Sequence, residues 1–457
     1  MNAKKTDLKE LEGWYAKSGN QLMLLYGGMD CRKEQLIKEF CVGKKHFYYR
    51  CRQLSAQEQM QKMGEEIQNA FQMKLSRYSY DEFFNRVKSG DASKLVIVID
   101  EAQYAIKRDP EFVKSILKLK MKRLYPGPVM IILASSSIVW ATQDAKDAFG
   151  DGFRRIDVLH KVEDLNFLEV VRTFPALSVS DCIRIYGSIG GVPGYMEAWN
   201  PEISYRENIY RLVLTEGGYL FHMAEQKISA ELRELSVYNT ILSAIAQGYN
   251  KLNDLYLKTG YSRAKISVYM KNLKQLGVVD KCKTFALRCQ DHEKKGMYEI
   301  TDALVHFWSR FILPYKTVLA IMTPEQFYEQ IIAPDLEAYT AVYFERMCVR
   351  YLGLMKEYKN SGLLNGRSGA WYGEKGTIPM VMEDREGRIL LMYTKWSSEP
   401  FTRKDLERNL RYLVNCDVNP DQYYIFAKSG FDAELRQKAQ RVKNMHLVDF
   451  SNMKFTK

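Results

Sequence analysis

Long apolar runs are absent from this sequence: no stretch of about 18 apolar residues is present that could cross a membrane as a helix. Cysteine is scarce, with 8 in 457 residues, and none form the close pairs that are typical of zinc sites. The 6 histidines do not cluster with the cysteines. Residues 1–7 are polar, so no secretory signal is visible. We therefore expect a cytoplasmic protein with reduced thiols and no membrane partner.

The charge of the chain indicates which partners to consider. Lys and Arg total 67 and Asp and Glu total 55, which gives a net charge of +12 and a pI near 9.0. Such a balance indicates a polyanion partner such as DNA, and a protein partner or self-association stays open as an alternative. Hydrophobic residues make up 46 %, and the length predicts about three domains with their own cores.

The first motif is a loop between a predicted strand and a predicted helix. Apolar residues 22–26 lead into the stretch GGMDCRKE, and an amphipathic run, residues 35–40, follows. A phosphate-binding loop of the form G-x-x-x-x-G-K-[ST] occupies this place in P-loop NTPases. Gly27 and Lys33 match that pattern, whereas Arg32 replaces the second glycine and Glu34 replaces the hydroxyl residue.

Both replacements remove phosphate-binding chemistry. A side chain at position 32 crowds the backbone that must approach the phosphates. The hydroxyl after the lysine is a magnesium ligand, and Glu34 supplies a negative charge instead. Two unit charges about 4 Å apart interact by about 4 kcal/mol at an effective dielectric near 20. We expect ATP and Mg²⁺ to bind weakly or not at all.

Two further strands end in polar residues. The β-branched run 94–99 ends in Asp100 and Glu101, where Asp100 would hold the metal and Glu101 would polarise the attacking water. The alternative is a buried strand that merely ends in two acids. Residues 128–134 form a third predicted strand, which ends in residues 135–137, all serine. These serines are either a sensor of the γ-phosphate or a turn and helix cap.

The order of these motifs resembles the prokaryotic and archaeal ATPase family, a branch of P-loop ATPases related to AAA+ and STAND proteins. YGGMDCRKE, IVIDEAQYA and IILASSS stand where the family has its loop and its two strand ends, and GGVPGYM matches a segment of its helical lid. The resemblance implies an α/β fold with a RecA/AAA-like parallel sheet. It implies nucleotide contacts from Gly27, Lys33 and Asp100, magnesium at Asp100, and a catalytic role for Glu101 if the protein is active. A family arginine role for Arg154 or Arg155 stays open.

A winged helix is predicted in the third region. Residues 238–247 and 251–258 form helices, a turn follows at 259–261, and Ser262 caps a third helix, residues 263–276. Strands at 277–280 and 297–300 enclose a polar hairpin tip at 289–296. The family carries a winged helix at this place as well.

The third helix of such a module usually reads the major groove. Its predicted DNA contacts are the positive side chains of Arg263, Lys265, Lys271 and Lys274, with Ser262, Ser267 and Tyr269 as polar contacts and Lys294 and Lys295 on the wing. The alternative is a module that packs internally or binds protein, with its charges merely solvated.

The last third resembles the C-terminal domain of many members of this family, which is akin to restriction-endonuclease-like PD-(D/E)XK folds. Pro379 and Tyr393 occupy the two carboxylate positions, and only Lys395 remains. A magnesium site needs such oxygen ligands, so we expect no nuclease activity. Glu383 and Asp384 fit a hairpin turn better than a metal site. Because proline lacks an N–H, the strand with Pro379 should be an edge strand or bulged.

Four domains are predicted: a P-loop ATPase-like domain at 1–165, a helical lid at 166–225, a winged helix at 226–315 and an endonuclease-like domain at 316–457. The leading hypothesis is an archaeal-type ATPase family protein whose nucleotide-binding loop is impaired and which acts as a DNA- or protein-binding scaffold. The rival is a working ATPase coupled to DNA binding. A third hypothesis is a nuclease with relocated metal ligands, such as Glu345 or Glu383.

Overall fold

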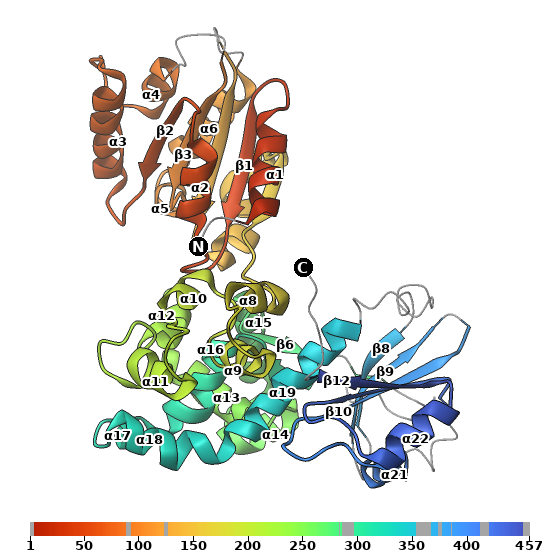
Figure 1. Ribbon diagram of the computed structural model, residues 1–457. Helices are drawn as coiled ribbons and strands as arrows, with labels where there is room; N and C mark the ends of the chain where they lie inside the picture. Colours follow the sequence, from red (N-terminus) through yellow and green to blue (C-terminus); the bar gives the residue numbers. More distant parts are fainter. Residues whose placement is uncertain are drawn as a thin grey trace. The chain divides into compact units, whose positions relative to one another are not determined.

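The chain folds as two compact units in the computed structural model (Figure 1). Unit 1 comprises Met1–Asp164 and Val192–Glu197, and unit 2 comprises Leu165–Gly191 and Ala198–Lys457. The structure describes residues 4–87, 93–122, 127–282, 284–285, 297–352, 367–372, 377–384, 386–411 and 420–450. Within these ranges no helix has the length and apolar character needed to cross a membrane. The division into four domains stays a prediction.

A five-stranded parallel sheet forms the centre of unit 1, in the order β2-β3-β4-β1-β5. Its strands are β1 (Gln21–Tyr26), β2 (His46–Arg50), β3 (Leu95–Asp100), β4 (Val129–Ser135) and β5 (Val158–Lys161). Strands β1, β3 and β4 are apolar and almost wholly buried, as expected for a parallel sheet that helices cover on both faces.

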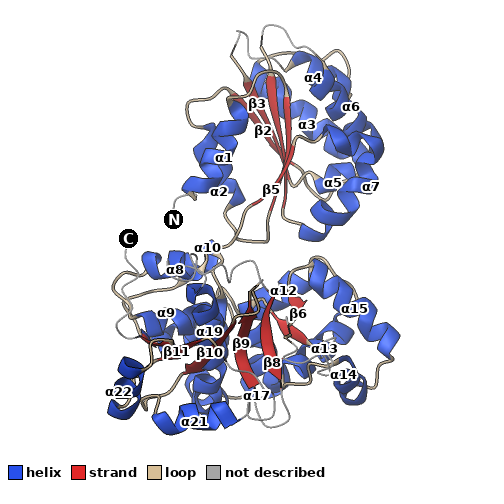
Figure 2. Ribbon diagram, turned by 90° about the vertical axis from the view of Figure 1, so that its right-hand side faces the viewer, coloured by secondary structure: helices blue, strands red, loops and turns tan. Residues whose placement is uncertain are grey.

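Helices cover the two faces of this sheet separately (Figure 2). On one face lie α1 (Lys5–Tyr15) and α2 (Lys33–Cys41). The other elements of unit 1 are α3 (Ala56–Phe71), α4 (Tyr80–Arg86), α5 (Gln103–Ile106), α6 (Pro110–Met121), the π-helix η1 (Trp140–Asp144), α7 (Ala145–Phe149) and the 3₁₀-helix η2 (Gly150–Arg155). Helices α3 to α7 pack on the opposite face, so the sheet is buried between two helical layers.

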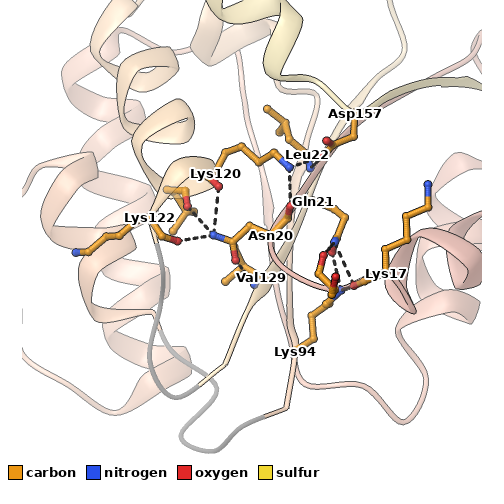
Figure 3. Close-up of polar contacts among 11 residues, drawn as sticks. Lys17, Asn20, Gln21, Leu22, Lys94, Lys120, Lys122, Val129 and Asp157 are labelled. Atoms are coloured by element: carbon orange, nitrogen blue, oxygen red, sulfur yellow. Dashed lines mark hydrogen bonds and ion pairs between the residues drawn. The ribbon is translucent and has the colours of Figure 1, made fainter.

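The amino ends of the strands are held by internal polar contacts (Figure 3). The amide nitrogen of Asn20 donates to the carbonyl oxygens of Leu119 and Lys120, both at 3.2 Å, and its Oδ1 accepts from the N–H of Val129 at 3.0 Å. Lys120 Nζ lies 2.6 Å from Asp157 Oδ2. This end of the sheet is therefore used for structure, and the carboxyl ends, where ligands bind in α/β sheets, carry the predicted motifs.

Unit 2 begins with helices. They are α8 (Phe167–Thr173), α9 (Val179–Ile189), α11 (Tyr205–Ile209), the π-helix η3 (Tyr210–Leu214) and α12 (Met223–Ser229), while α10 (Pro193–Ala198) runs from unit 1 into unit 2. Next come α13 (Leu235–Ala246), α14 (Leu252–Thr259), α15 (Arg263–Gln275), β6 (Val279–Lys281) and β7 (Tyr298–Ile300). Strands β6 and β7 pair antiparallel. The predicted tip between them, with Lys294 and Lys295, lies outside the described residues.

The rest of unit 2 starts with helices and ends with a second sheet. The helices are α16 (Ala303–Phe307), η4 (Trp308–Ile312), η5 (Leu313–Tyr315), α17 (Lys316–Leu319), α18 (Pro324–Phe327), η6 (Tyr328–Ile332) and α19 (Ala333–Leu352). The sheet has the order β12-β11-β10-β9-β8. Its strands are β8 (Arg367–Tyr372), β9 (Thr377–Glu383), β10 (Ile389–Lys395), β11 (Gln422–Ala427) and β12 (Met445–Asp449).

Helices also flank this second sheet, which is antiparallel from β8 to β10 and parallel from β10 to β12. Leu406 of α21 (Arg403–Arg411) and Leu435 of α22 (Ala433–Arg441) join the core on one face. Phe344 of α19 packs against Trp396 directly after β10. The second sheet thus has its own core and forms a separate α/β arrangement.

The strand that contains Pro379 is bulged but not at an edge. Strand β9 lies between β8 and β10, so of the two predicted alternatives, an edge strand or a bulged strand, the first does not apply. The register with β8 shifts from Gly369 opposite Val381 to Trp371 opposite Ile378, which leaves one extra residue on β9. The bulge falls at Pro379, where a missing N–H costs the ladder least, and this part of the prediction is confirmed.

Candidate functional site

The loop between β1 and α2 starts at Gly27, and a larger residue there would require neighbouring atoms to shift. A Cβ at Gly27 would lie 2.7 Å from Cys31 Sγ and 2.9 Å from the carbonyl oxygen of Val162. The N–H of Gly27 donates to the carbonyl oxygen of Ser135 at 3.3 Å. The predicted first glycine of the loop therefore has a packing role in the described structure.

Arg32 adopts a backbone conformation that suits the glycine it replaces. Its φ is +66°, and Asp30 in the same loop has a φ of +59°. A side chain in this left-handed region costs roughly 1–2 kcal/mol. The guanidinium of Arg32 forms an ion pair with Glu197, and the carbonyl oxygen of Asp30 accepts from the N–H of Gly194 at 3.0 Å. Contacts with residues 192–197 therefore hold the strained loop.

Lys33, the predicted phosphate ligand, is buried beneath its own loop. Its ammonium donates to the carbonyl oxygens of Gly27 at 3.0 Å and Gly28 at 3.2 Å, and it lies 3.7 Å from Cys31 Sγ. Burial raises the pKa of the Cys31 thiol despite the nearby Lys33 charge, so this thiol is neutral at pH 7. These partners of Lys33 are uncharged, and a phosphate would be a stronger one.

Glu34 brings a negative charge to the place of the magnesium-binding hydroxyl. A hydrogen bond from Lys38 lowers the pKa of Glu34, with further contributions from Arg50 and Arg32, so the carboxylate is ionised at neutral pH. Glu34 Oε1 lies 2.8 Å from Lys38 Nζ, and Glu34 Oε2 lies 3.7 Å from Arg50 Nη1. The charge expected from the sequence is therefore present, and two basic side chains partly balance it.

Asp100, the predicted magnesium ligand, is buried at the end of β3. Its Oδ2 accepts from the hydroxyl of Tyr48 at 2.7 Å, and its Oδ1 accepts from the N–H of Glu101 at 3.0 Å. Burial raises the pKa of Asp100 and outweighs the Tyr48 hydrogen bond and the charge of Arg50. The carboxyl group is thus desolvated and already used by groups of this chain.

Glu101, the predicted catalytic residue, is held in a fixed position. Its φ is +51°, a strained value for a residue with a side chain. Its Oε2 accepts from Gln103 Nε2 and from Ser136 Oγ, each at 2.6 Å. Ser137 Oγ instead accepts from the N–H of Trp140 at 3.0 Å, which is the geometry of a helix cap. The structure thus gives Ser137 the cap function and places Ser136 on Glu101.

Sequence reasoning missed three members of this site: Tyr48, Arg50 and Glu197. Tyr48 and Arg50 belong to a strand that the motif search did not use, and their alternation on β2 shows only that the two side chains share a face. Glu197 directly follows the GGVPGYM segment. Among the described residues, no group of three or more His, Cys, Asp or Glu side chains lies close enough together to hold a metal ion.

The predicted DNA contacts lie on the exposed side of α15. Exposed positions include Arg263, Lys265, Lys271 and Lys274. At about 100° per residue, positions 263, 271 and 274 fall within about 80° of one another, and position 265 points elsewhere. Of these, Arg263 bonds Asn253 Oδ1 and lies 4.2 Å from the ring centre of Tyr256, and Lys274 lies 2.6 Å from Asp280 Oδ1.

Two of the predicted polar DNA contacts also bond within the fold. Ser262 Oγ accepts from the N–H of Lys265 at 3.2 Å and caps α15, as the sequence predicted for the helix start. The hydroxyl of Tyr269 donates to Glu234. Lys265 lies 4.8 Å from the ring centre of Tyr261. The exposed surface of α15 is therefore characterised by its basic side chains, and Ser262 and Tyr269 are bonded to neighbouring groups of the chain.

The residues predicted to mark a former nuclease site in unit 2 make contacts within the fold. Lys395 Nζ lies 2.7 Å from Asp405 Oδ2 and donates to the carbonyl oxygen of Pro400 at 2.9 Å. Tyr393 is almost fully buried in the core of the second sheet. Pro379 and Tyr393 supply no carboxylate, and Lys395 is paired with Asp405.

The nearby acids, including Glu345 and Glu383, which were proposed as relocated metal ligands, do not form a free anionic site. Asp384 accepts from the N–H groups of Glu386 at 2.9 Å and Arg388 at 2.8 Å, so the hairpin-turn interpretation is confirmed for it. Glu383 pairs with Arg367. Burial raises the pKa of Glu345 to about 7, which leaves it a poor anionic ligand at neutral pH.

Two family models match parts of this chain. Residues 4–198 match a family described as an ATPase domain predominantly from Archaea, and residues 308–408 match DUF234, described as "Archaea bacterial proteins of unknown function". The uncharacterized protein MJECL04 of Methanocaldococcus jannaschii is 20 % identical over 391 residues, which cover 85 % of this chain and 86 % of that protein.

Solved structures with a similar fold include a Walker-type ATPase of Pyrococcus abyssi, PABY2304, at 20 % identity and a TM-score of 0.46, with 70 % of this chain and 96 % of that chain covered. Another is the ORC2 protein of Aeropyrum pernix in ADPNP–ADP complexes, at 11 % identity and a TM-score of 0.43, with the same coverage. The family match and the five-stranded parallel sheet together confirm the predicted class: an α/β P-loop NTPase fold, followed by a separate α/β sheet domain.

Proposed function

We propose that this protein is an archaeal-type P-loop ATPase relative whose nucleotide-binding loop is impaired, and that it acts in the cytoplasm as a DNA- or protein-binding scaffold. The observation that carries this proposal is the internal pairing of the loop. Lys33 is bonded to the carbonyl oxygens of Gly27 and Gly28, and Arg32 is paired with Glu197. A triphosphate must replace the first set of contacts beside the ionised carboxylate of Glu34.

Isothermal titration of the full chain with ATP and Mg²⁺ tests this proposal. We expect a dissociation constant weaker than about 10 μM, or roughly 7 kcal/mol of binding. A tighter constant, together with steady hydrolysis, would contradict it. The matched control is the same titration on the Lys33→Met variant, because any affinity that uses the loop must fall when its ammonium is removed.

A working ATPase coupled to DNA binding is the second candidate. The acids at the end of β3 favour it, because Asp100 is present and Glu101 is held by Ser136 in a defined position. Such an enzyme would hydrolyse ATP at a rate that Glu101→Gln reduces by about 10²-fold or more. Equal, negligible rates in the two proteins would leave the scaffold as the better proposal.

For DNA, we propose that α13 to α15 with β6 and β7 act as a winged helix that uses Arg263, Lys265, Lys271 and Lys274. The exposed positions of these side chains support it. Charge reversal of Lys265 and Lys271 should weaken binding and reduce the slope of log K against log salt by about one unit per lost phosphate contact. Lys114→Glu, at an exposed site of α6, is the matched control. Unchanged binding in the double variant would favour a protein partner.

We further propose that the second sheet has an endonuclease-like fold that cleaves nothing and serves as a binding or dimerisation surface. The supporting observation is the pairing of Lys395 with Asp405 beside Tyr393. Plasmid and single-stranded DNA incubated with Mg²⁺ or Mn²⁺ should stay intact. Cleavage that Lys395→Ala abolishes would instead support relocated metal ligands.

A further inference from the structure

Arg50 and Asp100 are brought together by the register of two parallel strands. In the pairing of β2 with β3, Tyr48 lies opposite Val98 and Arg50 lies opposite Asp100. Partners in register on parallel strands point to the same face of a sheet, and Tyr48 and Arg50 share a face because they are two residues apart. Val98 packs in the core beneath α2, so this is the face that carries α2 and its first residues.

The guanidinium of Arg50 lies between two carboxylates on that face. Its Nε is 3.7 Å from Asp100 Oδ2, and its Nη1 is 3.7 Å from Glu34 Oε2. Glu34 occupies the place of the magnesium-binding hydroxyl, and Asp100 is the acid at the end of β3. A positive side chain of this chain therefore bridges the two positions from which a P-loop fold contacts its metal ion.

Magnesium does not fit this arrangement. The ion requires near-octahedral oxygen coordination at about 2.0–2.1 Å, and it usually retains several waters. Both oxygens of Asp100 already accept hydrogen bonds, from Tyr48 and from the N–H of Glu101. A dication would also have to displace the guanidinium of Arg50 or tolerate its charge nearby. The groups around Asp100 therefore do not fit the magnesium ion that a P-loop fold implies.

We infer that Arg50 takes the place of the divalent cation between Glu34 and Asp100, with Lys38 as a second basic partner of Glu34, and that any phosphate ligand of this loop binds without a metal. The inference concerns the same loop as the proposed function, but it does not depend on whether ATP binds. It also explains how an acid at position 34 is accommodated: an acid and an arginine replace a hydroxyl and a metal ion.

Titration of the full chain with Mn²⁺ alone, followed by electron paramagnetic resonance of the free ion, tests this inference. The wild-type protein should show no Mn²⁺ site in this loop. Arg50→Ala should create one, with affinity at least about tenfold above the wild-type background, equivalent to about 1.4 kcal/mol. Combining Arg50→Ala with Glu34→Gln should abolish the new site. Arg50→Gln, which removes the charge but keeps an unbranched polar side chain, is measured in parallel in case the alanine variant folds poorly.

Arg52→Ala is the matched control, because it removes the same charge two residues away. Arg52 is exposed and lies 4.0 Å from Glu66. A wild-type Mn²⁺ site that Asp100→Asn removes would overturn the inference, and so would an Arg50 variant that binds no more Mn²⁺ than the Arg52 variant. Since no nucleotide is added, these results are independent of the ATP titration.

Discussion

Two lysines, one in each unit, stand at positions that the sequence analysis singled out, and their partners differ. Lys33 in unit 1 donates to the neutral carbonyl oxygens of Gly27 and Gly28. Lys395 in unit 2 lies 2.7 Å from the carboxylate of Asp405. A neutral carbonyl can be exchanged for a phosphate at little cost, whereas an ion pair must first be broken. The contacts of Lys33 can therefore be exchanged for a ligand, whereas the ion pair of Lys395 is part of the folded structure.

The pKa values of Asp405, beside Lys395, and of Asp100, in the candidate site with Lys33, shift in opposite directions. Burial alone would raise the pKa of Asp405, but hydrogen bonds from Lys395 and Thr402 outweigh it and hold the pKa below its usual range. At Asp100 burial prevails, and the pKa is raised. The ionised carboxylate of Asp405 therefore stabilises the folded state, whereas the ionised carboxylate of Asp100 destabilises it.

The largest expected effect is a difference in the loss of protein stability when each of the two lysines is replaced. Lys395→Met leaves the carboxylate of Asp405 without its partner and should reduce the free energy of unfolding by about 2–3 kcal/mol. Lys33→Met removes only hydrogen bonds to carbonyl groups and should cost about 1 kcal/mol. Urea unfolding measures both. Adding Asp405→Asn to Lys395→Met should restore part of the loss, and equal losses for the two lysines would contradict the comparison.

The second effect concerns repair of the two sites. Arg32→Gly with Glu34→Thr gives the left-handed position its glycine and removes the negative charge, so ATP should bind at least about tenfold tighter, or about 1.4 kcal/mol. Pro379→Asp with Tyr393→Glu should yield neither Mn²⁺ binding nor cleavage, because Lys395 stays paired with Asp405. Titration and a plasmid assay measure these outcomes, and an unchanged ATP affinity would show that the loop residues are not what limits binding.

The smallest effect is a difference in pH dependence. The lowered pKa of Asp405 gives stability above the unfolded pKa of about 3.9, and this stability is lost as the pH falls through the folded pKa. Asp405→Asn should thus destabilise the protein at pH 7 and much less near pH 3. The raised pKa of Asp100 acts oppositely, because its favourable contribution exists below about 3.9 and is lost as the pH rises through the folded pKa.

Asp100→Asn should therefore be neutral near pH 3 and stabilise the protein at pH 7 by about 0.5–1 kcal/mol. Thermal or urea unfolding at a series of pH values gives the two curves. If Asp405→Asn and Asp100→Asn change the stability in the same direction at pH 7, the proposed difference between the two carboxylates is contradicted.

The sequence predicted elements whose signal is local. The apolar runs that became β1, β3 and β4 and the capping serine of α15 are examples, because burial and capping depend on neighbours in the chain. Arg50 could not be found this way, since its meaning depends on its register with Asp100 across two strands. Pro379 shows the same limit: a missing N–H predicts a break in the ladder, but only the strand order decides between an edge and a bulge.

Residues 192–197 belong to unit 1, although the chain on both sides of them belongs to unit 2. Within unit 1 this segment contacts both left-handed residues of the loop, through Gly194 to Asp30 and through Glu197 to Arg32. A Cβ at Gly194 would lie 2.7 Å from the Cβ of Asp30, so the two backbones move together or separate. Within unit 1, a ligand that changes the backbone at Asp30 or Arg32 must therefore also change the contacts of residues 192–197, a segment whose two ends continue into unit 2.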